Sequence, residues 1–82
     1  MHVNDCVQKR IKQLLSENNL TMYKLAQYSG IPYTTLKSII YSEYPNPTIE
    51  VIKHICDGLG ITLVDFFSSP EFSEPWKHKE NK

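Results

Sequence analysis

Apolar residues recur at helical spacing along most of the chain. Val7, Ile11, Leu14 and Leu15 follow one another at intervals of four, three and one. On a helix with 3.6 residues per turn, this spacing places all of them on one face. The pattern therefore predicts an amphipathic helix over residues 4–18, with one face in a core and polar residues on the other.

Four shorter helices are predicted to follow, each marked by a capping residue or a helix breaker. Thr21, Thr48 and Thr62 suit N-cap positions, because a hydroxyl can accept a hydrogen bond from a free N–H group of the first turn. Gly30 suits the end of the second helix, where a positive φ is least costly, and Pro32 suits the start of the third. The apolar residues of these four helices are Leu25, Ala26, Leu36, Ile39, Ile40, Ile52, Ile55, Cys56, Leu59, Leu63, Phe66 and Phe67.

The last two of these helices carry further signals. The fourth, over residues 49–60, is predicted to close at Gly58 and Gly60. In the fifth, Asp65 lies three residues after Thr62, which is the spacing of a capping box with an acidic residue.

The composition changes at residue 68. Residues 68–82 are polar and contain two prolines, which is typical of a tail that is ordered only where Phe72 or Trp76 contacts a surface. No segment alternates apolar and polar residues as a strand would. We therefore expect an all-α fold, a bundle of five short helices in one domain over residues 1–67, followed by a tail.

Length and composition narrow the class of protein. With 82 residues, of which 40% are hydrophobic and 22% charged, the chain suits one small soluble domain. No apolar run approaches the length of a membrane span, and the start lacks the order of a secretory signal. Cys6 and Cys56 lie too far apart in sequence for metal-ligand spacing, so we expect two reduced thiols in a cytoplasmic protein without a metal or other cofactor.

The charges are balanced overall but not along the chain. The net charge is zero, yet residues 1–44 hold five basic and three acidic side chains, whereas residues 45–82 hold four and six. This mild basic excess is compatible with one weakly positive face for an anionic partner. A glycine-rich phosphate loop and a nucleophile beside a base are both absent from the sequence, so we expect no enzyme.

The most informative segment is LTMYKLAQYSGIPYTTLKSI, residues 20–39. It places a turn at Gly30 between two short helices, with the small residue Ala26 four positions earlier. Two helices that cross steeply leave room only for a small side chain at that point, and Ile31, Leu36 and Ile39 can fill the space between them. This spacing is typical of a helix-turn-helix, whose second helix enters the DNA major groove.

With these residues in place, residues 7–67 resemble the Cro and lambda-repressor-like helix-turn-helix domain (XRE type). The resemblance continues through residues 47–52, residues 59–62 and residues 65–67, which are similar to the fourth and fifth helices of that family. It implies a lambda-repressor-like fold that binds operator DNA, commonly as a homodimer, and represses transcription in a bacterium or phage.

The resemblance also implies which residues contact double-stranded DNA. The positions that contact bases fall on Tyr33, Thr34 and Ser38, with Lys37 between them. The third helix lacks Arg, Gln and Asn, so base discrimination is expected to be modest or to depend partly on DNA shape. A packing role remains open for Tyr33.

Phosphate contacts are expected at the start of the second helix, whose free N–H groups and positive dipole end suit an anion. We assign them to Thr21, Met22, Tyr23 and Lys24, and to Tyr41 at the end of the third helix. Met22 stands where the family often has Gln, so it can offer only its backbone. Tyr41 could also be a packing aromatic.

The fifth helix and the tail carry more apolar area than one small core needs. We expect a homodimer interface there, formed by Leu63, Phe66, Phe67 and Trp76, although core packing is also open for at least one phenylalanine. The alternative function is that of a protein-interaction module, such as the antitoxin of a toxin–antitoxin pair, for which the zero net charge and Met22 are arguments.

Overall fold

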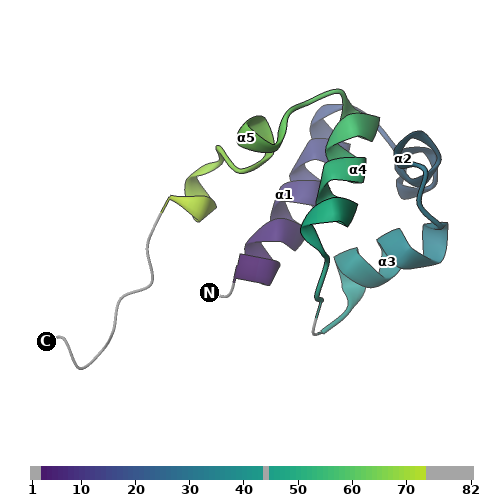
Figure 1. Cartoon of the computed structure of the whole chain (residues 1–82), viewed down its shortest axis with the longest axis horizontal. Helices are drawn as coiled ribbons and strands as arrows, with labels where there is room; N and C mark the ends of the chain where they lie inside the picture. The colour runs from purple at the N-terminus through teal and green to yellow at the C-terminus, as the bar shows by residue number, and fades with distance from the viewer. Residues whose placement is uncertain (1–2, 44, 74–82) are drawn as a thin grey trace, which may run out of the picture.

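Helices make up the regular structure of the computed structural model, which describes residues 3–43 and 45–73 (Figure 1). The elements are α1 (Val3–Glu17), α2 (Met22–Ser29), α3 (Tyr33–Tyr41), α4 (Ile49–Leu59), α5 (Leu63–Phe66) and the 3₁₀ helix η1 (Pro70–Phe72). In Figure 1, α2 and α3 lie on one side of α1 and α4, and α5 and η1 lie on the other side.

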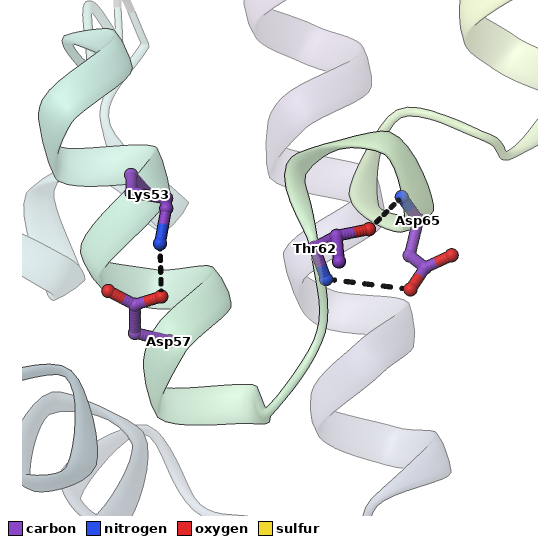
Figure 2. Close-up of polar contacts among 4 residues, drawn as sticks. All are labelled: Lys53, Asp57, Thr62 and Asp65. Carbon is purple, nitrogen blue, oxygen red and sulfur yellow. Dashed lines mark hydrogen bonds and ion pairs between the residues drawn. The ribbon is translucent and has the colours of Figure 1, made fainter.

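Threonine caps begin three of the helices, as the sequence predicts. The hydroxyls of Thr21, Thr48 and Thr62 accept hydrogen bonds from the N–H three residues later, at 3.1, 3.1 and 3.0 Å respectively. At Thr62 the bond is reciprocal, because Asp65 Oδ2 accepts from the Thr62 N–H at 3.5 Å (Figure 2). This capping box sets the start of α5, a single turn that could not persist on its own.

The start of α3 differs slightly from the expectation. Pro32 has an extended backbone, with φ −62° and ψ 143°, and it occupies the N-cap rather than the first helical position. Its carbonyl accepts from the N–H groups of Thr35 and Leu36 at 3.0 and 3.1 Å. Proline suits this place too, since its fixed φ is compatible with the N-cap and it has no N–H to satisfy.

The core is one cluster that draws on all five α-helices. Of the residues that define the predicted stripe of α1, Val7, Ile11 and Leu14 are buried and Leu15 is half-buried. The other buried members of the cluster are Leu25, Ala26, Leu36, Ile39, Ile40, Ile52, Ile55, Cys56 and Phe66. The burial of this apolar surface is the main favourable contribution to folding.

The C-terminal end of the described chain folds back against α1. The Cys6 thiol donates to the Glu71 carbonyl at 3.6 Å. Phe72 packs edge-on against Phe67, with ring centroids 4.9 Å apart, and Phe66 makes a similar contact with Phe67 at 4.9 Å. Residues 70–72 thus continue the packing beyond residue 67, whereas Trp76 lies outside the described residues.

Gly58 lies inside α4 rather than at its end, and this corrects the sequence-based expectation. Gly60 is the residue that closes α4, in a left-handed conformation with φ 73°. A Cβ at Gly58 would collide with Ser29 Oγ and would lie 2.9 Å from the Ser29 backbone nitrogen and 3.0 Å from its Cα. The glycine therefore permits a close approach of α4 to the end of α2.

The surface ion pair in α4 contributes little to this packing. The ion pair between Lys53 and Asp57 links successive turns of α4 (Figure 2), but both side chains are more than half exposed. Such a pair contributes at most about 0.5 kcal/mol to stability. Within the described ranges, no helix has both the length and the apolarity needed to cross a bilayer.

Gly58→Ala tests the close approach of the two helices. Helix propensity alone predicts a gain of about 1 kcal/mol for alanine over glycine in a helix. We expect the opposite, a loss of about 1–3 kcal/mol in the free energy of unfolding, because the new methyl group would push α2 and α4 apart. Urea unfolding followed by circular dichroism measures this.

Ser29→Ala serves as the control background. Removing the Ser29 hydroxyl leaves its backbone nitrogen in place, so the double variant should remain less stable than Ser29→Ala alone. If Gly58→Ala proves as stable as the wild type, the helices are not in the contact described.

Candidate nucleic-acid interface

The turn between α2 and α3 depends on Gly30. This residue has φ 70° and ψ 27°, a left-handed conformation that glycine adopts at little cost. The N–H groups of Gly30 and Ile31 donate to the carbonyls of Gln27 and Ala26 at 3.3 and 3.2 Å. Ala26 itself is buried, in keeping with the small side chain that the crossing requires.

One face of α3 is buried and the other is open to solvent. Leu36, Ile39 and Ile40 are in the core. The exposed face carries all five of the α3 residues assigned to DNA, namely Tyr33, Thr34, Lys37, Ser38 and Tyr41. The structure thus brings these five onto one surface, where a groove-binding helix must present them.

A groove of about 490 Å³ runs beside this surface. One wall comes from α3, with Thr34, Ser38 and Ile39, and the other from the loop and first turn that follow, with Asn46 and Thr48. The remaining lining residues are Thr35, Ser42, Pro45, Pro47 and Val51. The sequence analysis did not place Asn46 or Thr48 at the DNA-binding surface. Pro45 and Pro47 and the cap at Thr48 are typical of a loop that leads into a helix.

The start of α2 lies next to the start of α3. Tyr23 and Tyr33 have ring centroids 5.9 Å apart, so the two N-terminal ends share an aromatic contact. Tyr23 and Lys24 are exposed, whereas the Met22 side chain is half-buried and packs against the core. Thr21 caps the Lys24 N–H, which leaves the N–H groups of Met22 and Tyr23 without partners inside the helix.

Some cationic side chains are exposed to solvent, whereas Arg10 is hydrogen-bonded to the backbone of another helix. Lys24 and Lys37 are exposed and extend from the helices of the turn. Arg10, which counted toward the basic excess of the front half, instead donates to the carbonyls of Phe66 and Asp65 at 2.7 and 2.8 Å. Its guanidinium therefore caps α5, and fewer charges are free for a phosphate backbone than the sequence alone indicates.

The residues assigned to a dimer interface require one correction. Phe66 is fully buried, so it fills the core of its own chain and cannot contact a second one. Leu63 and Phe67 are half-buried. Sequence reasoning missed Val64, which is 79% exposed.

The two cysteines do not form a site with the histidine nearby. Cys56 is fully buried, and burial raises the pKa of its thiol, whereas His54 on the same helix is exposed. In the ranges that the structure describes, no three His, Cys, Asp or Glu side chains gather as metal ligands would.

Comparisons with known proteins agree with this geometry. A family model described as the Cro/C1-type HTH DNA-binding domain matches residues 10–70, which is most of the chain. The chain belongs to this family. Both the predicted family and the predicted lambda-repressor-like all-α fold are therefore confirmed.

Among solved structures, the Cro/C1-type domain is similar to the crystal structure of the prophage Lp1 protein 11. The TM-score is 0.77 and the sequence identity is 29%, and the match covers 88% of this chain and 95% of that one. A search of curated proteins finds no match. As a member of this family, the chain is a DNA-binding domain.

Gly30→Ala tests the turn of this Cro/C1-type domain. Beyond the residues adjacent in the chain, no heavy atom lies within 4 Å of a Cβ built at Gly30, so any cost must come from the backbone conformation and not from a collision. We expect a loss of about 1–2 kcal/mol in the free energy of unfolding, the cost of a left-handed conformation for an ordinary residue.

Gly30→Asn is the matched variant, because asparagine adopts the left-handed region more readily. Thermal melts should rank the wild type first, then Gly30→Asn, then Gly30→Ala. The reverse order for the two variants would mean that the positive φ is not what the turn requires.

Proposed function

We propose that this Cro/C1-type domain is a sequence-specific transcriptional regulator that acts as a repressor, with α3 in the major groove of an operator. The observation that supports this most directly is the exposed face of α3. Five residues able to contact DNA lie on it, opposite the three that anchor the helix in the core.

Base contacts are assigned to Tyr33, Thr34 and Ser38 and to Lys37 between them, and the Lys37 ammonium is also expected to reach the phosphate backbone. Hydroxyl groups donate to or accept from several base edges, and the methyl group of Thr34 can contact the methyl group of thymine. The hydroxyl side chains cannot make the paired hydrogen bonds that Arg or Lys forms with guanine or Asn with adenine. Asn46, which lines the same groove as Ser38, adds one amide to the surface.

Phosphate contacts are assigned to the start of α2 and to Tyr41. The free N–H groups of Met22 and Tyr23, with the Lys24 ammonium beside them, form a cationic end for one phosphate. Thr21 fixes this end through its cap, and the half-buried Met22 side chain anchors it to the core. Tyr41 is 63% exposed at the opposite end of the surface.

Substitutions on α3 should separate the two kinds of contact. We expect Lys37→Ala to weaken binding to all duplexes and to lower the salt dependence by about one unit of slope, because one fewer counterion is released. Thr34→Ala and Ser38→Ala should change the preference between duplexes instead. Fluorescence anisotropy on a duplex selected from a random pool, and on variants of it, distinguishes these effects.

Lys53→Ala is the matched control, since it removes the same charge from α4 outside the proposed surface. It should leave the slope almost unchanged. An equal loss on every duplex for all three α3 variants would contradict the assignment of base contacts, and a wild type that selects no duplex would contradict the function.

We also propose that two copies pair through α5. A single domain of this size covers about half of a typical operator, and paired recognition helices enter successive major grooves about 34 Å apart. Val64 is 79% exposed beside the half-buried Leu63 and Phe67, and α5 lies on the other side of α1 and α4 from α3 (Figure 1). Pairing there would leave both recognition helices free.

The exposed Val64 also favours the second candidate function. The same patch could hold a different protein, as in an antitoxin, and the zero net charge of the chain suits a module that does not depend on DNA alone. The oligomeric state of the isolated chain distinguishes these two candidate functions.

Val64→Lys should shift the chain from dimer to monomer, because a charge would be placed in an apolar contact. Sedimentation equilibrium at tens of micromolar measures this, and operator affinity should fall together with dimerisation. Val3→Lys is the control, since Val3 is 62% exposed on α1 and the change in charge is the same. A monomeric wild type that binds DNA one-to-one would overturn the homodimer.

A further inference from the structure

A polar stripe on α1 contacts the end of α3 and the loop behind it. Asn4, Gln8 and Lys12 lie four residues apart, so they share one face of the helix. The Asn4 side-chain amide donates to the Pro45 carbonyl at 2.7 Å, and the Lys12 ammonium lies 5.4 Å from the centre of the Tyr41 ring.

Gln8, at the centre of this stripe, makes two hydrogen bonds. Its Nε2 donates to the carbonyl of Ile39 at 3.0 Å and to the carbonyl of Ser42 at 2.9 Å. The first of these carbonyls belongs to the last turn of α3, where no N–H group further along the helix is available to it. One side chain thus joins the end of the helix to the residue that follows it.

The need for this contact comes from how α3 ends. α2 and α4 end at glycines whose left-handed conformation turns N–H groups back toward the last carbonyls. α3 ends instead at Ser42, which is extended with φ −68° and ψ 145° and whose backbone N–H donates to the Ser38 carbonyl. The amide of Gln8 supplies from another helix the donor that a glycine cap would otherwise provide.

The anchored residues also line the groove beside the exposed face of α3. Ile39, Ser42 and Pro45, whose carbonyls accept from Gln8 and Asn4, belong to the groove lining, with Ser38 on one wall and Asn46 on the other. Gln8 and Asn4 of α1 therefore anchor both the end of α3 and the following loop. Because both are tied to the same helix, the distance between these two parts of the groove lining is fixed.

We propose that Gln8 is a positioning residue for DNA recognition, which holds the end of α3 and the following loop in the arrangement that fits an operator. This inference rests on the proposed function. Gln8 is uncharged and no phosphate contact is assigned to it, so its loss should affect discrimination between duplexes and not the general attraction to DNA.

Gln8→Met tests this role, because methionine keeps the length of the side chain and its helix propensity but has no donor. The readout is the ratio of two affinities, for the duplex that the wild type selects from a random pool and for a scrambled duplex of the same length. We expect this ratio to fall about tenfold, the effect of roughly one unsatisfied carbonyl. The salt dependence on the scrambled duplex should be unchanged.

Two further variants make the test specific. Gln13→Met is the same change on the same helix, at a residue whose side chain contacts Arg10, and it should leave the ratio at the wild-type value. Gln8→Lys restores a donor at the same position and should recover part of the lost ratio. All measurements are made well below the melting temperature of each variant, so that loss of fold does not contribute.

Amide hydrogen exchange gives a readout that does not need DNA. In Gln8→Met, amides at the end of α3, including that of Ser42, should exchange faster than in the wild type, whereas those of α2 and α4 should not. If the wild type selects a duplex and the ratio in Gln8→Met stays at the wild-type value, the positioning role is overturned and the proposed function stands. If the wild type selects no duplex, the proposed function fails and the role of Gln8 in recognition fails with it.

Discussion

The close contact between α2 and α4 is the constraint on which the rest of the structure depends. At Gly58 the backbone of α4 comes so near to Ser29 that no side chain fits between them. The buried residues of both helices, among them Leu25 and Ile55, then belong to one hydrophobic cluster. Since Gly30 follows Ser29 directly, this contact also fixes where the turn begins, and through the turn it fixes the direction of α3.

Around this contact, α1 supplies side chains that complete helix ends elsewhere. Gln8 reaches the end of α3 and Arg10 the end of α5, in both cases by donating to backbone carbonyls. A short helix gains little from its own hydrogen bonds, because nucleation is unfavourable and each end leaves groups without partners. Polar residues of α1 thus hold the two helices that carry the proposed DNA and dimer surfaces.

The signals that predicted the fold correctly are local. The hydroxyls of Thr48 and Thr62 cap groups three residues away, and Gly30 acts within its own turn, so all three follow from short-range geometry. The apolar stripe containing Ile11 likewise follows from helical periodicity alone. The same periodicity separates Leu36 from Lys37, which places the proposed DNA-facing residues on the exposed side of α3.

What the sequence could not predict depends on residues far apart in the chain. From the sequence alone, Gly58 predicts a helix end, because glycine often ends helices. Its role in the close approach to Ser29 becomes clear only when the position of α2 is known. Arg10 is counted as a free charge unless the position of α5, 55 residues later, is known. The distinction between the buried Phe66 and the exposed Val64 also needs the packing of α5, because one turn is too short to define a face by periodicity.

This division of polar residues bears on how such a domain would bind DNA. Arg10 is engaged at α5, and Lys53 is paired with Asp57. The helices on either side of the turn carry two exposed lysines, Lys24 and Lys37. The non-specific attraction of one copy to a phosphate backbone grows with the number of cations that face it, so the engagement of Arg10 at α5 reduces this attraction. Under the proposed function, discrimination between duplexes depends on where the hydroxyl groups of α3 are placed, because a hydrogen bond weakens steeply when its geometry is lost. A binding face of this kind requires a rigid support, and the contacts from α1 to the end of α3 provide one.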